Sequence, residues 1–402
     1  MIGIESMGKR VRHRFALFDY GFRPFFLFAG LYAAIGILGW IGAWHGAWTP
    51  ATPLAFSQWH AREMVFGFGT AALAGFLLTA VPNWTAMGPV RGARLASLSG
   101  LWLAGRIMAW LSGEEAALAF AMVDLTFLPA LAASIAPGIV KRNLRRNGAF
   151  VLMLVILTAA NAATHAEALG ADWASARWGI ELGLGVLLVM ISIIGGRIVP
   201  AFTIGGLRMA GRPVAIEPAP RLDLLAIAAT AGFVIAQAIG ADEAFVGAVS
   251  AAAAAAHCAR LARWHGWRSF GTPLVWILHL AYAWLIVGFA VMAAHGLGAP
   301  VAASAGFHAL GAGAVGTMIL AVMSRASLGH TGRTLVADRA TVIAYWLVTA
   351  GACLRVVAGL FPGHVDVAMI GLAGGLWAGG FAVFTARYLP ILVGPRVDGQ
   401  VG

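Results

Sequence analysis

The chain of 402 residues is 60% hydrophobic, has only 11% charged residues and carries a net charge of +11. A soluble globular protein has about 25% charged residues, so this composition excludes a soluble domain and indicates an integral membrane protein. Nucleic-acid binding would need a soluble basic module, and the sequence shows none, so no nucleic-acid partner is expected. The two cysteines, Cys258 and Cys353, stand alone in apolar stretches and predict neither a disulfide nor a CxxC site.

Apolar stretches of about 20 residues, each long enough to cross a bilayer as a helix, recur along the chain. They lack the period-two alternation of outer-membrane strands, so the sequence predicts an all-α polytopic membrane protein with about twelve transmembrane helices. The predicted spans are residues 24–44, 59–81, 94–111, 116–137, 149–168, 176–196, 221–240, 244–261, 272–294, 300–323, 339–360 and 366–389. The first span is expected to be retained, because no small-residue cleavage site follows it.

The longest connection, residues 198–220, contains four prolines and divides six spans, 24–196, from six more, 221–389. Pro200 is expected to stop the sixth helix near the start of this connection. No convincing repeat relates the two halves, so the sequence does not support an inverted-repeat transporter. The whole chain, 1–402, is therefore expected to form a single integral membrane domain.

Positive charges alternate between the connections, as the positive-inside rule requires. If the N-terminus is cytoplasmic, nearly all lysines and arginines fall in cytoplasmic segments, whereas acidic residues such as Glu114 and Asp172 fall outside. The basic residues that do not fit are Arg62, Arg106, Arg177 and Arg355. The sequence therefore predicts that both termini are cytoplasmic.

The second predicted span opens with three chemically active side chains, His60, Arg62 and Glu63. At about 100° per residue, Glu63 lies on nearly the same helix face as His60, and Arg62 lies nearly opposite. Ionisable groups inside a membrane are costly and indicate a functional site. Small residues such as Gly67 continue the His60 face and leave room for a neighbouring helix or a flat ligand.

Other histidines also lie within predicted spans. His165 and His308 are placed, like His60, toward the predicted outer face, and His279 lies toward the inner face. Any one of them is explained most simply by a hydrogen bond within the bundle, but three on one side favour a metal site. Neutral imidazole is the commonest metal ligand and suits iron and copper, and glycines around His308 leave room for a haem ring.

Two basic segments lie at the predicted inner interface, GGRIVPAFT at 195–203 and SRASLGHTGR at 324–333. Arg197, Arg325 and His330 in these segments are suited to hold an anion, such as a haem propionate or a lipid head group. The simpler interpretation is that the positive charges only set the topology.

Several long motifs resemble the NnrS family. They are FRPFFLFAGLYA (22–33), WHAREMVFGFGTAALAGFLLTAVPNWT (59–85), GGRIVPAFT (195–203), WILHLAYAWLIVG (276–288) and HALGAGAVGTMILAVMSRASLGHTGR (308–333). They are spread over nearly the whole chain, and FRPFF, GFLLTAVPNWT and SLGHTGR are long and unusual. The resemblance implies a bacterial inner-membrane protein of about twelve spans that contains haem and copper and is linked to nitric-oxide metabolism and nitrosative-stress resistance.

The expected site follows from this resemblance together with the histidines. We expect haem b as the cofactor and nitric oxide or a related small molecule as its ligand. The lipid bilayer is expected to surround the protein. The expected metal ligands are His60, His165, His308 and His279, the further cofactor-binding residues are Arg62, Arg197, Arg325 and His330, and the catalytic proton carrier is Glu63. Binding, reduction and electron transfer from quinol or another respiratory-chain donor all remain open, so an oxidoreductase is one of several alternatives.

One residue departs from the family pattern. That pattern reads His-x-His-Glu-Met in the second span, and here Arg62 replaces the second histidine. Positions two apart on a helix differ by about 200°, so one metal would hardly be bound by both. A site built on His60 is therefore retained, whereas the second metal, copper, loses a family ligand. Arg62 is expected to pair with Glu63 or with a haem propionate.

Two other functions fit the same architecture. A transporter for a metal or a small nitrogen compound is compatible with twelve spans, although few charges lie at mid-membrane depth. Two of these, Arg106 and Asp124, are expected to pair in a structural role. An assembly factor for a respiratory oxidase is the other alternative. Solute uptake by a colourless protein would favour the transporter, and capture of an oxidase subunit would favour the assembly factor.

Overall fold

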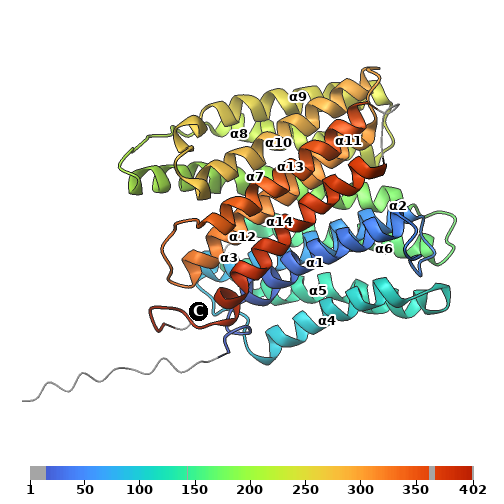
Figure 1. Ribbon diagram of the computed structural model, residues 1–402, viewed down its shortest axis with the longest axis horizontal. Coiled ribbons are helices and arrows are strands. Elements are labelled where there is room, and N and C mark those ends of the chain that lie inside the picture. Colours follow the sequence, from blue (N-terminus) through green and yellow to red (C-terminus); the bar gives the residue numbers. More distant parts are fainter. Residues whose placement is uncertain (1–14, 143, 362–366, 401–402) are drawn as a thin grey trace, which may run out of the picture.

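Long apolar helices form almost all of the structure, a computed structural model that describes residues 15–142, 144–361 and 367–400. The described residues contain no strand. The helices are α1 (Phe22–Trp44), α2 (Phe56–Arg62), η1 (Glu63–Gly69), α3 (Thr70–Thr85), α4 (Ala93–Leu111), η2 (Glu114–Ala116), α5 (Ala117–Arg142), α6 (Leu144–Ala168), α7 (Ala176–Met209), α8 (Pro220–Ala238), α9 (Glu243–Ala262), η3 (Gly266–Ser269), α10 (Pro273–Gly296), α11 (Ala303–His308), η4 (Ala309–Gly316), α12 (Thr317–His330), α13 (Arg339–Leu360) and α14 (Val367–Val393). They lie roughly side by side, and α2 and α11 lie at one end of the bundle, which we call the histidine end (Figure 1).

The predicted all-α membrane architecture is confirmed. Within the described residues, eleven helical stretches are long and apolar enough to cross a membrane. Helix α4, with 19 residues, completes the twelve predicted spans, although Arg94 and Arg106 make it more polar than the others. Ala16 N donates a hydrogen bond to Val393 O at 2.8 Å, so the first and last described segments lie at the same end of the bundle, opposite the histidine end. An even number of spans requires this arrangement.

The prediction that Pro200 ends the sixth helix was wrong. Helix α7 continues through Pro200 and runs for 34 residues to Met209, so the connection to α8 covers only residues 210–219. Proline removes one backbone hydrogen bond, but it is tolerated within transmembrane helices, because neighbouring helices and small local adjustments satisfy the freed backbone group. The apolar pattern on both sides of Pro200 therefore decided the helix length.

The helices pack as three similar groups of four spans. The first group is α1, α2–η1–α3, α4 and α5, the second is α6 to α9, and the third is α10, α11–η4–α12, α13 and α14. In each group the first span packs on the second and the third packs on the fourth. The fourth span then packs on the first span of the next group: α5 on α6, α9 on α10 and α14 on α1. The three groups thus close into a ring. The sequence did not reveal this arrangement, because the groups have the same order of helix contacts but no recognisable sequence similarity.

Arg23 joins the two ends of the chain. Its buried guanidinium donates from Nη1 to Leu392 O at 2.9 Å and to Gly394 O at 2.6 Å. The last carbonyls of a helix have no partners within that helix, and they carry the negative end of its dipole. Arg23 therefore caps the C-terminal end of α14 from the start of α1.

We expect Arg23→Leu to lower the free energy of unfolding by about 2 to 3 kcal/mol, because charge-assisted hydrogen bonds to buried carbonyls are lost. The measurement is the thermal unfolding midpoint of the purified protein in detergent. Arg94→Leu is the control, because Arg94 is exposed near the same end of the bundle. Equal midpoints for the two variants would show that the cap contributes nothing.

Candidate functional site

His60 and His308 occupy corresponding places in the first and third groups of helices. Each lies at or near the end of a short α-helix, and each is followed by a π-helical segment, η1 or η4. π-Helices are rare and are frequent at functional sites. Glycines are common in both segments, and no atom lies within 4 Å of the Cβ position at Gly311, so open space adjoins the third residue after His308.

The two imidazoles lie near the same end of the bundle, the histidine end. His60 lies within electrostatic range of His308, and the guanidinium of Arg355 on α13 lies within range of both rings. Both histidine side chains are only partly exposed, as is Arg355. Tertiary structure therefore places two predicted ligands, 248 positions apart in the chain, in the same region, and adds a cation that the prediction had not included.

The hydrogen bonds of His308 fix which nitrogen is available to a ligand. Its Nδ1 lies 2.7 Å from Ser304 O, and because a carbonyl oxygen only accepts, Nδ1 carries the proton. In the neutral ring Nε2 then keeps its lone pair. A backbone hydrogen bond on one nitrogen and a free lone pair on the other is the usual arrangement of a metal-binding histidine.

Polar atoms without partners cluster around His60. Nδ1 of His60, Nε1 of Trp40 and Nε of Arg355 are buried and have no hydrogen bond. The rings of His60 and Trp40 are in contact, with centroids 4.6 Å apart. Buried polar groups are almost always satisfied, so a set of unsatisfied ones in one place indicates a ligand. The residues present thus fit a cofactor with a metal that accepts imidazole nitrogen and an acidic group for Arg355.

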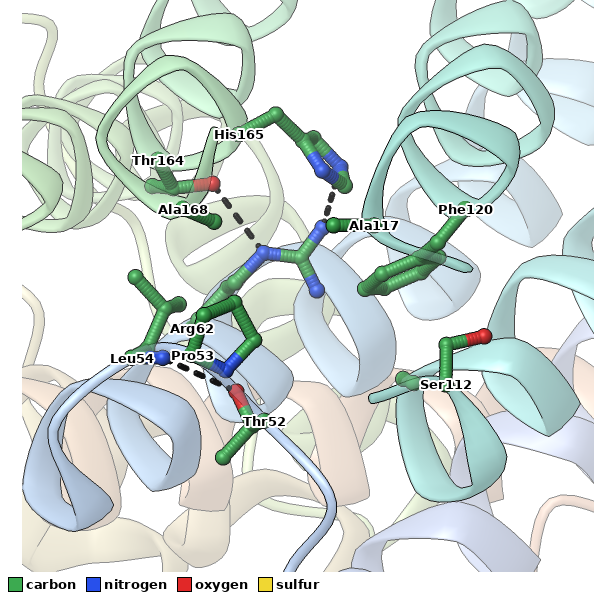
Figure 2. A pocket seen from close by; sticks show the side chains of 11 residues that line it. Thr52, Pro53, Leu54, Arg62, Ser112, Ala117, Phe120, Thr164, His165 and Ala168 are labelled. Carbon is green, nitrogen blue, oxygen red and sulfur yellow. Dashed lines mark hydrogen bonds between the residues drawn. The ribbon is translucent and has the colours of Figure 1, made fainter. Parts of the chain in front are cut away.

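His165, the third predicted ligand, is placed elsewhere. Its Nε2 lies 2.5 Å from Nη2 of Arg62 (Figure 2). The same nitrogen lies 3.0 Å from Oδ2 of Asp124. Arg62 lies on the side of α2 opposite His60, as the helix angle predicts. Across the described residues, no three His, Cys, Asp or Glu side chains are arranged to hold a metal ion. Of the three histidines predicted to lie together, His60 and His308 therefore share one region, and His165 belongs to a different polar cluster.

That cluster is a buried network of two arginines and two acids. Arg62 donates from Nη1 to Glu63 Oε1 at 2.7 Å and from Nη2 to Asp124 Oδ2 at 2.5 Å. Arg106 donates to Glu63 Oε2 at 2.5 Å and also pairs with Asp124, as predicted. Tyr32 donates a hydrogen bond to Glu63. The network joins α1, α2–η1, α4, α5 and, through Thr164 and Asn161, α6.

The network also changes the interpretation of Glu63. Both of its carboxylate oxygens accept hydrogen bonds from arginine, so its negative charge is matched by fixed positive charges. Such a carboxylate holds helices together, and this geometry favours a structural role over that of a proton carrier. Arg62 pairs with Glu63, which was one of its two expected partners.

A small cavity connects this network to the loop before α2. It has a volume of about 20 Å³ and is lined by Arg62, His165, Phe120 and the loop residues 52–54 (Figure 2). About 10 to 15 Å³ is enough for one water molecule, provided that polar partners are present. The cavity therefore suits a single water next to Arg62 and His165.

His279 has a hydrogen-bond pattern of a structural histidine. The hydroxyl of Thr203 donates to Val199 O at 2.7 Å, so it accepts from Nε2 of His279 at 2.8 Å. Nδ1 has no partner and faces Gly266. No group of three or more His, Cys, Asp or Glu side chains surrounds this ring among the described residues, and the bond to Thr203 favours a structural histidine over a second metal site.

The basic residues predicted to hold an anion lie too far from the histidine pair to serve the same cofactor. Arg325 is 17 positions beyond His308 in one nearly continuous helix, which corresponds to roughly 25 Å. Its guanidinium packs on the ring of Phe202, 4.1 Å from the centroid. His330 stacks on Tyr20 near the same end of the bundle. An anion-binding role for these residues and for Arg197, exposed on α7, stays a prediction, but a haem propionate at the His60–His308 site is not its ligand.

Arg355 is the residue that the prediction missed. It was visible in the sequence as one of four basic residues that do not fit the positive-inside pattern. Arg62 and Arg106, two of the others, are explained by buried acids, and Arg177 pairs with Glu181 at 2.8 Å. Among the described residues no acidic side chain pairs with Arg355, so within that part of the structure its charge is available to an acidic group of a ligand.

The fold and the site together define a polytopic helical membrane protein with two histidines near one end of the bundle and an arginine, Arg355, that no acidic side chain of the described residues pairs with. The NnrS protein family matches residues 16–396 of the 402-residue chain, and the chain belongs to this family. No curated protein matches the sequence.

Proposed function

We propose that this protein is a haem b protein of the bacterial inner membrane that binds or turns over nitric oxide, and that it contributes to nitrosative-stress resistance or denitrification. The observation that carries the proposal is that His60 and His308 lie within electrostatic range of each other and of Arg355, which has no acidic partner among the described residues and whose Nε makes no hydrogen bond. Membership of the NnrS family supports it.

The residues have distinct roles in this proposal. Nε2 of His308 would be an iron ligand, since Ser304 holds its Nδ1 proton. His60 would be the other imidazole available to the metal, and Arg355 would neutralise a haem propionate. Haem iron would supply the position at which nitric oxide coordinates. Copper is the weaker part of the family expectation, because Arg62, at the family histidine position, is used in the ion-pair network.

An apolar cavity between the three second spans supports access of a gas from the lipid. It has a volume of about 90 Å³ and is lined by apolar side chains of α3, α7 and α12, including Ala72, Leu187 and Met318. Apolar cavities stay dry and bind small apolar molecules. Nitric oxide is small and apolar, so it needs no polar channel to reach a membrane-embedded site.

The direct test is an absorption spectrum of the purified protein after haem-replete expression, recorded as dithionite-reduced minus oxidised. We expect a Soret band and an α band, and a shift of both when nitric oxide is added to the reduced protein. A colourless protein under these conditions would refute the proposal and favour a transporter or an assembly factor for an oxidase.

Arg355→Leu is expected to weaken haem binding by about 10- to 100-fold, the usual cost of removing a group that supports a cofactor. Arg355→Lys keeps the charge and should recover part of the affinity. The measurement is haem titration of the apoprotein followed at the Soret band. Equal affinity of the leucine variant and the parent protein would show that Arg355 does not face the cofactor.

A further inference from the structure

Six buried hydroxyl side chains lie in the third group of helices, and four of them are linked to one another: Ser324, Thr341, Tyr345 and Tyr388. They come from α12, α13 and α14, and none is more than 3% exposed. We call them the hydroxyl file: Thr317, Ser324, Ser327, Thr341, Tyr345 and Tyr388. A run of buried hydroxyls within spans that are otherwise apolar is unusual, because each must find a partner away from bulk water.

One end of the file reaches the surface. Asp338 and Arg387 form an ion pair there, with side chains 41% and 40% exposed. Thr341 donates its hydroxyl proton to Asp338 Oδ1 at 2.8 Å. The hydroxyls of Thr341 and Tyr388 are 3.2 Å apart, so Tyr388 must donate to Thr341. A hydrogen-bonded chain therefore leads from a surface carboxylate to a tyrosine that is 1% exposed.

Deeper in the bundle the hydroxyls lack partners. Ser324 faces both Tyr388 and Tyr345, and its own proton is donated to Leu320 O at 2.6 Å. The hydroxyl oxygens of Thr317 and Ser327 are buried and make no hydrogen bond, and that of Tyr345, although close to Ser324, has no hydrogen bond of good geometry. An unsatisfied buried hydroxyl costs about 1 to 3 kcal/mol, and bound water is the usual remedy. Three such groups along the same group of helices as Ser324 indicate bound water at more than one place.

The file points along the helix that carries His308. Thr317 and Ser324 are seven residues apart, so they lie on nearly the same face and are separated by roughly 10 Å. Thr317 directly follows η4, and η4 directly follows His308. Between them, Nε1 of Trp284 is buried without a partner, and its ring adjoins Gly313. Unsatisfied polar atoms thus continue from Ser324 toward the histidine end.

We propose that the hydroxyl file binds a chain of water molecules that conducts protons from the Asp338 surface toward His308. Each hydroxyl or water accepts one proton and releases another, so the net change is one proton moved and no bond to carbon or nitrogen is altered. The direction of proton movement, from the surface toward His308, rests on the proposed function, because reduction of nitric oxide consumes protons. The file replaces Glu63, whose oxygens are occupied, as the proton route.

The bound water is tested first, without any need for haem. X-ray radiolysis in ¹⁸O-water produces hydroxyl radicals in place, so a buried side chain is labelled only where water lies beside it. We expect mass spectrometry to find label on Tyr345 and Tyr388. Tyr282 is the matched control, because it is fully buried but its hydroxyl is satisfied by Arg260 and His257. Labelling of Tyr345 and Tyr388 no greater than that of Tyr282 would overturn the proposal.

Proton movement is tested with variants that remove one hydroxyl and keep the shape. Tyr345→Phe and Thr317→Val are expected to slow proton uptake after reduced protein is mixed with nitric oxide by about 100-fold, a usual contribution of a positioned proton-transfer group. The nitric-oxide-bound spectrum should not change. Thr349→Val is the control, because Thr349 lies on α13 one turn from Tyr345 and donates only to the Tyr345 carbonyl.

The outcomes separate the two proposals. Unchanged proton uptake in Tyr345→Phe, or a haem-containing parent protein that binds nitric oxide without taking up protons, would overturn proton conduction. A protein without a Soret band that is nevertheless labelled at Tyr345 would refute the haem function and support the buried water file.

Discussion

The purified His308→Ala protein is expected to lack the Soret band of the parent, because it loses the one imidazole whose second nitrogen is already fixed by a backbone hydrogen bond. His60→Ala should lose most of the haem or shift its absorption maxima. The measurement is haem content per protein, by pyridine haemochrome assay, after haem-replete expression. Full haem content in both variants would refute the assignment of the pair.

Two comparisons show whether the loss reflects a missing ligand rather than a damaged fold. His165→Ala and His279→Ala should keep the pigment, since those rings are held by Arg62 and Thr203. In His308→Gly, added imidazole should fill the space of the lost side chain and restore the Soret band. Restoration by imidazole is not expected if the glycine variant simply misfolds.

Asp124→Asn is expected to reduce the free energy of unfolding by about 3 to 5 kcal/mol, the usual cost of leaving a buried charge without its partner. Asp124 pairs with both Arg62 and Arg106, and all three side chains are at most 5% exposed. The variant leaves two guanidinium groups facing the single carboxylate of Glu63. A loss of several degrees in the thermal unfolding midpoint, with lower yield from membranes, is the expected result.

The double variant Asp124→Leu/Arg106→Met tests whether the cost arises from charge imbalance. It removes one charge of each sign and leaves Arg62 paired with Glu63, so it should be more stable than Asp124→Asn alone. Glu181→Gln is the surface control, because its partner Arg177 is 75% exposed and such pairs contribute about 0 to 1 kcal/mol. A double variant less stable than the single one would contradict the charge argument.

The sequence by itself determined the membrane class and the number of spans. Twenty-residue apolar stretches have one stable form in lipid, the helix, because every backbone polar group must be satisfied within the segment. The same reasoning placed His60 and Arg62 on opposite faces of one helix, and the structure confirms that they contact different surroundings. The sequence prediction failed at Pro200, where the rule that proline ends a helix did not apply to a transmembrane helix.

Only the tertiary structure decided which charged and polar side chains meet. The sequence grouped His165 with His60 and His308 because all three lie at the same depth, but depth does not specify the angle around the ring of helices. Packing of α5 on α6 brings His165 to Asp124, and packing of α11 on α13 brings Arg355 to His308. The residues of a span are enough to predict that it forms a transmembrane helix. A site depends on which helix faces lie opposite one another, and those contacts join residues far apart in the chain.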